Sequence, residues 1–203
     1  MDVLVIILFS YLSGSIPFGL ILTKIFGDQD IRTIGSGNIG ATNVLRTGNK
    51  FLAASTLILD VLKGYAPVVA TVHFFPEHLQ LSALMAFLGH IFPIWLKFKG
   101  GKGVATYLGI LFALSYGLGV LFIFTWVVVT LIFKYSSVSS MFSSLTVLVI
   151  TLFRENAVKA IDPNFAFATD IKLILFVFFI LIIFSHRKNI SNLKNKTEQK
   201  IKI

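Results

Sequence analysis

The chain has 203 residues, of which 56% are hydrophobic and only 13% are charged, and its mean hydropathy is +0.86. Soluble domains carry about 25% charged residues, so this composition excludes the soluble classes and indicates an integral membrane protein. The absence of cysteine excludes disulfide frameworks, thiolate nucleophiles and cysteine metal sites. The net charge of +9 relates to membrane topology and to anionic lipid or phosphate, and we expect no nucleic acid partner.

Apolar stretches follow one another along most of the chain, and a membrane-spanning helix needs about 20 mostly apolar residues. They cover residues 3–26, 51–75, 79–96, 104–133, 136–153 and 171–185. A cleaved signal peptide begins with basic residues, whereas the only early charge here is Asp2. We therefore interpret the first stretch as an uncleaved membrane helix.

The stretch 104–133 decides the number of spans. As a single helix it would be about 45 Å long against a hydrocarbon core of about 30 Å, and it contains Gly109, Gly117 and Gly119. The segment after His186 carries six basic residues and one acid, so the positive-inside rule places it in the cytoplasm. Six spans would put this segment outside. A split near Ser115 predicts an all-α protein of seven transmembrane helices, with the N-terminus outside and the C-terminus cytoplasmic.

This topology places loops 27–50 and 97–103 on the cytoplasmic face. It places the segment 154–170 outside, where acids outnumber Arg154 and Lys159. We predict one transmembrane domain over residues 1–185 and a basic cytoplasmic tail over residues 186–203.

The first cytoplasmic loop contains the sequence GSGNIGATNVLR at residues 35–46. Three glycines in six residues let the backbone curl so that successive amides can face one anion. Further donors come from the side chains of Ser36, Asn38, Thr42, Asn43 and Arg46. A flexible surface loop would have a similar composition. The density of donors followed by an arginine favours a phosphate-binding loop.

The second cytoplasmic loop contains Gly100, Gly101, Lys102 and Gly103 directly before a predicted helix. A helix N-terminus presents unpaired amides and a positive dipole to an anion, and a lysine between glycines can swing onto it. The loop is not a Walker A motif, because Gly103 stands where that motif has Ser or Thr. A basic positive-inside loop would account for the lysines but not for the glycines.

Other polar residues give weaker indications of function. His186 and Asn189 lie at the cytoplasmic end of the last stretch, where they could bind a hydroxyl or a phosphate, or form a basic helix cap. Asp60 and Lys63 share one helical face, as functional groups or as a structural ion pair. We interpret His90 as a packed residue. No histidine has an aspartate five positions later, and no cluster has metal-ligand spacing, so we expect no metal and no cofactor.

Five segments together carry a family resemblance. They are residues 14–19 (GSIPFG), 35–46, 60–64 (DVLKG), 89–106 and 186–190 (HRKNI). In these segments the chain resembles the bacterial membrane glycerol-3-phosphate acyltransferases that use acyl phosphate, the PlsY family. It departs from the family pattern at Asn192, where arginine is usual, and at Lys196, where glycine is usual.

The resemblance implies transfer of a fatty acyl group from acyl phosphate to the 1-hydroxyl of glycerol 3-phosphate. The products would be lysophosphatidic acid and phosphate, in the first acylation step of phospholipid synthesis. It implies a location in the bacterial cytoplasmic (inner) membrane, with the active site on the cytoplasmic face, membrane lipid around it, and a peripheral phosphate acyltransferase as the supplier of acyl phosphate. Carried onto this sequence, the catalytic residues are Ser36, His186 and Asn189. The substrate-binding residues are Gly35, Asn38, Thr42, Asn43, Arg46, Gly101, Lys102, Gly103, Ser137 and Ser140.

The leaving group limits what the protein must supply. Phosphate leaves readily from an acyl phosphate, so alignment and screening of charge matter more than a strong base. His186 is equally well explained as a base or as a group that orients the hydroxyl, and we expect no acyl-enzyme on Ser36. A transporter or channel for small phosphates is the competing class, although the polar residues cluster on one face and no repeat is visible. A membrane scaffold would leave the glycines unexplained.

Overall fold

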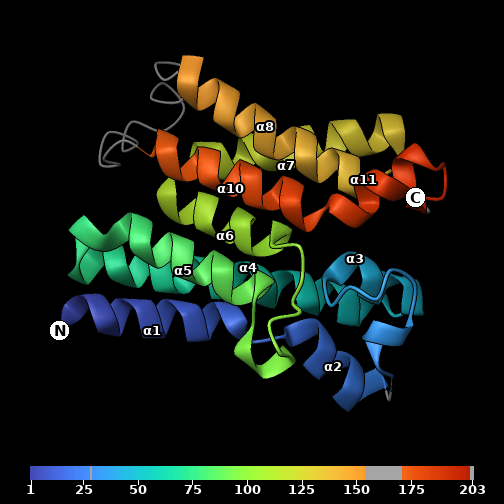
Figure 1. Cartoon of the computed structure of the whole chain (residues 1–203), viewed down its shortest axis with the longest axis horizontal. Coiled ribbons are helices and arrows are strands. Elements are labelled where there is room, and N and C mark those ends of the chain that lie inside the picture. The colour runs from blue at the N-terminus through green and yellow to red at the C-terminus, as the bar shows by residue number, and fades with distance from the viewer. Residues whose placement is uncertain (28, 154–170, 202–203) are drawn as a thin grey trace. The chain divides into compact units, whose positions relative to one another are not determined.

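The computed structural model describes residues 1–27, 29–153 and 171–201, and every regular element in these ranges is a helix (Figure 1). The chain divides into two compact units, Met1–Ala113 and Leu114–Ile203. The charged residues of segment 154–170, including Arg154 and Lys159, lie outside the described residues.

The first unit contains the loops at residues 27–50 and 97–103 and the helices around them. Its elements are α1 (Asp2–Ser15), α2 (Phe18–Gly27), η1 (Ile31–Thr33), α3 (Ala41–Val44), η2 (Leu45–Thr47), α4 (Lys50–Phe74), η3 (Pro76–His78), α5 (Leu79–Ile91), η4 (Ile94–Leu96) and α6 (Val104–Leu114). Helix α1 packs against α5 and α4, as Figure 1 shows.

Glycine allows α1 and α5 to approach closely. A Cβ atom at Gly14 would overlap the carbonyl of Ala86, and one at Gly89 would overlap the carbonyl of Tyr11. The Tyr11 hydroxyl donates to the carbonyl of Phe92 at 2.6 Å. Since lipid tails are as apolar as leucine, close packing of backbones is what holds helices together in a membrane.

The first apolar stretch is broken at Pro17. Proline lacks an N–H and cannot continue the helical ladder, so α1 ends at Ser15 and α2 begins at Phe18. The Lys63 ammonium of α4 donates to the Ile16 carbonyl at this break, with a distance of 2.7 Å. Lys63 also lies 2.6 Å from Asp60 Oδ1. The structure therefore shows the ion pair that the sequence left as one of two alternatives.

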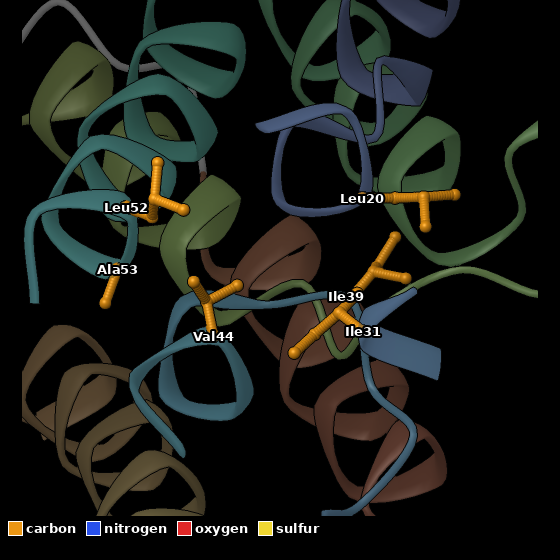
Figure 2. Close-up of a cluster of buried hydrophobic side chains, with 6 residues drawn as sticks. All are labelled: Leu20, Ile31, Ile39, Val44, Leu52 and Ala53. Carbon is orange, nitrogen blue, oxygen red and sulfur yellow. The ribbon is translucent and has the colours of Figure 1, made fainter. Parts of the chain in front are cut away.

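The loop at residues 27–50, called the first loop below, has a small hydrophobic core, which Figure 2 shows. It combines one residue from α2, three from the loop and two from α4, namely Leu20, Ile31, Ile39, Val44, Leu52 and Ala53. Ile31 and Val44 are fully buried. A loop with its own core is ordered, so the alternative of a flexible surface loop is wrong for this segment.

The second unit contains α7 (Tyr116–Phe133), α8 (Ser136–Phe153), α10 (Lys172–Ser185) and α11 (Arg187–Lys194). Helix α8 packs against α7 and α10. Serines and threonines join α7 to α8: Thr130 donates to Ser139 at 2.7 Å, and the Trp126 indole donates to Ser140 at 3.2 Å. Most of the hydroxyls on α8 also donate to a carbonyl one turn back, which lowers the cost of burying them.

The predicted break near Ser115 is confirmed, because α6 ends at Leu114 and α7 begins at Tyr116. Within the described residues, five helical segments are long and apolar enough to cross a membrane, or six when the bent pair α10 and α11 counts as one span. The segment Asp2–Gly27 counts as one of them despite its break, and α6 is a shorter apolar helix. The protein is thus an all-helical membrane protein, and the number of seven spans stays a prediction.

Candidate active site

Asn43 organises the first loop from its interior. Its side-chain amide donates to the carbonyls of Ile31, Ile34 and Asn38 at distances of 3.0, 2.9 and 2.8 Å. Asn43 is only 2% exposed, and its bonds connect three turns of the loop. The amide predicted as a phosphate donor is engaged inside the loop, and it sets the shape of the loop.

The side-chain oxygen of Asn43 accepts hydrogen bonds from two of the predicted site residues. Asn43 Oδ1 accepts from the backbone N–H of Ser36 at 3.0 Å, from the Ser36 hydroxyl at 3.2 Å and from Arg46 Nη1 at 3.2 Å. Both Ser36 and Arg46 are exposed. One buried oxygen therefore fixes a hydroxyl and a guanidinium side by side at the surface of the loop.

Gly35 is required by this arrangement. It adopts the left-handed conformation with φ of 55°, and a Cβ atom there would press on Asn43 Oδ1 and on Arg46 Cδ. The Asn38 side chain accepts from the N–H of Gly40 at 2.9 Å. Thr42 lies exposed in α3. The structure thus brings together Gly35, Ser36, Asn43 and Arg46, with Asn38 bonded to them through its backbone.

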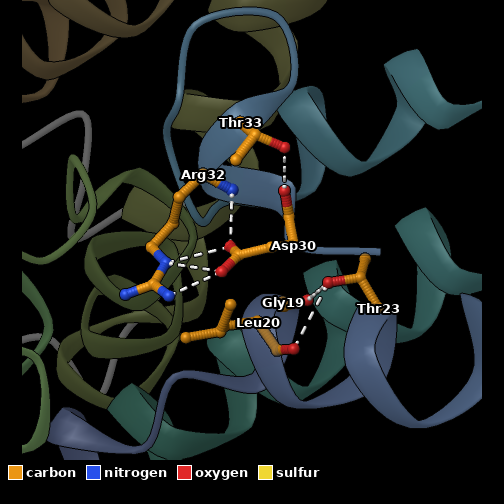
Figure 3. Close-up of polar contacts among 6 residues, drawn as sticks. All are labelled: Gly19, Leu20, Thr23, Asp30, Arg32 and Thr33. Atoms are coloured by element: carbon orange, nitrogen blue, oxygen red, sulfur yellow. Dashed lines mark hydrogen bonds and ion pairs between the residues drawn. The ribbon is translucent and has the colours of Figure 1, made fainter. Parts of the chain in front are cut away.

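An ion pair holds the start of this loop, as Figure 3 shows. Asp30 caps η1 by accepting from the backbone N–H of Arg32 at 3.0 Å, and it pairs with the Arg32 guanidinium. The hydrogen bonds from Arg32 hold the pKa of the Asp30 carboxyl well below its usual range. Thr33 donates to the Asp30 carbonyl at 2.9 Å. This turn fixes Ile31, whose carbonyl is one of the acceptors of Asn43.

The second loop is held against the end of α5. The backbone N–H groups of Gly100 and Gly101 donate to the carbonyls of Ile91 and His90 at 3.0 and 3.1 Å. A Cβ atom at Gly101 would overlap the His90 ring, and one at Gly103 would overlap the Phe87 ring. The glycines therefore let the loop lie flat on α5 on both sides of Lys102.

His90, in α5, packs against this loop at Gly101. It is buried, and its Nδ1 lies 3.0 Å from the hydroxyl of Thr106 in the first turn of α6. The interpretation of His90 as a packed residue agrees with this contact. Lys102 is half-buried, directly before α6 begins at Val104.

The second unit gathers polar side chains around Glu198. Glu198 Oε1 accepts from the Ser137 hydroxyl at 2.8 Å and from the Asn189 amide at 2.6 Å, and Asn192 reaches Oε2 at 3.3 Å. The N–H of Ile201 donates to the carbonyl of Lys134 at 2.8 Å, so the tail folds back onto the start of α8. Sequence reasoning did not include Glu198 in the site, although it is the single acid among the basic residues of the tail.

His186 stands at the bend between α10 and α11 and is fully buried. Its Nδ1 lies 2.8 Å from the carbonyl of Ile182. Because a carbonyl oxygen can only accept, we assign the hydrogen to Nδ1, which makes Nε2 the acceptor in the neutral ring. Ser140, by contrast, accepts from the Trp126 indole and donates to the carbonyl of Ser136.

The sequence profile of the glycerol-3-phosphate acyltransferases matches residues 4–196, which is nearly the whole chain. The chain belongs to this family.

Individual members of the glycerol-3-phosphate acyltransferase family match over almost their full length. The glycerol-3-phosphate acyltransferase of Pelagibacter ubique is 52% identical over 100% of both chains. That of Mesorhizobium japonicum is 49% identical over 96% of this chain and 94% of its own. PlsY, solved in a glycerol 3-phosphate form, is 32% identical with a TM-score of 0.87, covering 100% of this chain and 96% of that chain. The PlsY resemblance found in the sequence is confirmed.

The two departures from the PlsY pattern have local structural effects. Lys196 stands where glycine is usual, and it adopts a left-handed φ of 59°, which suits glycine best. Asn192 stands where arginine is usual, and its amide still reaches Glu198. The tail of this acyltransferase therefore contains a left-handed turn at a residue that is not glycine.

Proposed function

We propose that the protein transfers a fatty acyl group from acyl phosphate to the 1-hydroxyl of glycerol 3-phosphate, releasing lysophosphatidic acid and inorganic phosphate. The observation that carries this proposal is the first loop, where one buried amide oxygen fixes Ser36 and Arg46 side by side. Family membership supports the acceptor. A second PlsY structure, 31% identical with a TM-score of 0.85, is a lysophosphatidic acid form, which supports the product.

Two anion-binding loops favour a donor that itself carries phosphate. Glycerol 3-phosphate needs one such loop, and the second loop around Lys102 offers another set of amides and a cation. In a thioester donor the reacting carbonyl carries sulfur, so no phosphate would lie beside the attacked carbon. The acyl chain itself would be accommodated among the apolar helices and membrane lipid.

The reaction would proceed by direct attack. The 1-hydroxyl oxygen of glycerol 3-phosphate bonds to the carbonyl carbon of the acyl phosphate, and the bond from that carbon to the phosphate oxygen breaks. The hydroxyl proton passes to the departing phosphate, directly or through Nε2 of His186. In the first unit, Arg46 and Lys102 would hold the phosphates and Ser36 would donate a hydrogen bond. In the second unit, the Ser137 hydroxyl and the Asn189 amide both donate to Glu198 Oε1, which fixes the orientation of the Asn189 side chain.

The donor is tested with purified protein in vesicles and labelled glycerol 3-phosphate. We expect lipid-extractable product from acyl phosphate without added metal, little or none from acyl-CoA or acyl-carrier protein, and inhibition by inorganic phosphate. Comparable turnover with acyl-CoA would contradict the proposed donor. Passage of label across the vesicle membrane without acylation would instead support a transporter.

The phosphate ligands are tested by substitution. Arg46→Ala and Lys102→Ala should lose most of the activity, and Arg46→Lys should be impaired because lysine cannot make a bidentate contact. Lys99→Ala is the matched control, because Lys99 is an exposed lysine of the same loop. Near-normal activity in either alanine variant would remove that residue from the site.

The proposed topology has seven spans, the N-terminus outside and the active site on the cytoplasmic face of the bacterial inner membrane. The basic tail and the confirmed break at Ser115 support it. Single cysteines at Tyr116 and Asn195, both exposed, can be labelled in this cysteine-free chain with an impermeant reagent. We expect outside labelling only at position 116, and labelling of position 195 from outside would overturn the topology. A peripheral phosphate acyltransferase on the cytoplasmic side would supply the acyl phosphate.

A further inference from the structure

One turn of α4, residues 60–64, carries the two charged side chains of Asp60 and Lys63 in the middle of a candidate membrane span. Both side chains are 2% exposed and form an ion pair of 2.6 Å. Burying two charges is unfavourable unless further bonds compensate, and charges inside spans are commonly functional. The second contact of the Lys63 ammonium shows what this pair does.

That second contact is the Ile16 carbonyl, 2.7 Å from Lys63 Nζ, at the break made by Pro17. The Lys63 ammonium also lies 5.7 Å from the centre of the Phe18 ring, the first residue of α2. Lys63 therefore contacts both sides of the break. A charge-assisted bond at this point fixes the direction in which α2 leaves α1.

Helix α2 in turn supports the first loop. A Cβ atom at Gly19, three residues after the bonded carbonyl, would overlap the carbonyl of Ile39, which lies between Asn38 and Gly40 of that loop. Leu20 and Ile39 also share the hydrophobic cluster of Figure 2. A change in the direction of α2 would therefore shift the loop that carries Ser36 and Arg46.

The same turn of α4 also lies beside the support of the second loop. A Cβ atom at Gly64 would overlap the carbonyl of Thr106, whose hydroxyl contacts His90, and the His90 ring lies against Gly101. His90 Nδ1 is 4.0 Å from Asp60 Oδ1. Residues 60–64 thus contact the supports of both loops within one helical turn.

We propose that Lys63 is a positioning residue for acyl transfer: its bond to the Ile16 carbonyl orients α2 and thereby the phosphate-binding loop of Ser36 and Arg46. The inference rests on the proposed function of that loop. The contacts also allow a second role for Lys63, which is to neutralise the buried charge of Asp60. The two roles predict different results for a variant in which both side chains are uncharged.

The test compares Lys63→Met with the double variant Asp60→Asn/Lys63→Met, which leaves no buried charge. If Lys63 positions α2, the double variant regains the thermal stability that Lys63→Met loses, but the KM for one phosphate substrate stays about tenfold or more above wild type, as expected for loss of one charge-assisted bond. The affected substrate should be the one whose KM rises in Arg46→Lys. Lys63→Arg, which keeps the donor, should recover most of this loss.

Ser13→Ala is the matched control, because the Ser13 hydroxyl bonds to the backbone carbonyl of Lys63 at 3.2 Å without involving the ammonium. Its KM values should equal those of wild type. A wild-type KM in the double variant, or a double variant that does not elute as monodisperse protein, would overturn the positioning role. Normal activity of Arg46→Lys and Arg46→Ala would instead overturn the proposed function of the loop, so the two failures are distinguishable.

Discussion

Replacement of Asn43 by alanine tests whether the first loop is shaped from within. The substitution removes the donor for three backbone carbonyls and the common acceptor of Ser36 and Arg46. The bond to Ile31 is buried, so its carbonyl would lose its partner away from water, at a cost of about 1–3 kcal/mol. The bonds to Ile34 and Asn38 are partly exposed and contribute about 0.5–1.5 kcal/mol each.

The total loss of stability, about 2–6 kcal/mol, affects the loop itself, because all six partner atoms lie within residues 31–46. A loop that is ordered only part of the time binds its ligand more weakly by that fraction. Even the lower end of the range corresponds to a fall in kcat/KM of more than about tenfold. We expect Asn43→Ala to lower kcat/KM by about a hundredfold while the protein still inserts into the membrane.

The assay is initial-rate acylation of labelled glycerol 3-phosphate in vesicles, combined with a thermal melt in detergent. Asn49→Ala is the matched control, since Asn49 caps α4 by accepting from the N–H of Leu52 at 3.0 Å and has no bond to the loop's donors. It should lose about 1 kcal/mol of stability with little change in kcat/KM. A kcat/KM for Asn43→Ala within about threefold of wild type would refute the reasoning.

Three further predictions concern the tail and the start of the loop. Glu198→Gln should lower kcat/KM about tenfold, because Ser137 and Asn189 lose a charged common acceptor. Unchanged rates would show that the tail has no role in catalysis. Lys196→Gly should raise the melting temperature, because it removes a left-handed lysine that costs about 1 kcal/mol, and a lower melting temperature would contradict the assigned φ. Asp30 has a lowered pKa, so its pair with Arg32 contributes fully above about pH 5 and is lost progressively as the pH falls below that value; wild type should lose stability relative to Asp30→Asn from about pH 5 downward, and parallel melting curves would argue against the pair.

The sequence predicted the break at Ser115 but not the break at Pro17, and the reason is length. Residues 104–133 are too long for one span, so the arithmetic required a division. Residues 3–26 have the length of a single span, so length did not indicate a break there, and the signal in the sequence was Pro17 itself. The partner that stabilises this break, Lys63, is 47 residues away and is identified only by tertiary contact.

The candidate site was predicted in residue type more than in role. The donors of residues 35–46 were recognisable because glycines and polar side chains are dense there. That Asn43 points inward depends on the carbonyls of Ile31 and Ile34, which local sequence does not place. Glu198 was missed because its contact with Ser137 spans 61 residues and the tail carries no apolar periodicity that would indicate folding.

The glycine contacts between helices affect how the sequence can change over time. Gly14 and Gly89 join α1 to α5 through backbone atoms, while large side chains such as Leu8 and Ile58 are exposed on the outside of their helices. Because these contacts between α1 and α5 are made by main-chain atoms, substitutions among aliphatic residues on the outer faces leave the contacts intact. The protein can therefore adapt its lipid-facing surface to bilayers of different thickness or fluidity while its interior geometry stays constant. Replacement of Gly14 or Gly89, in contrast, would push α1 and α5 apart in a bilayer of any thickness.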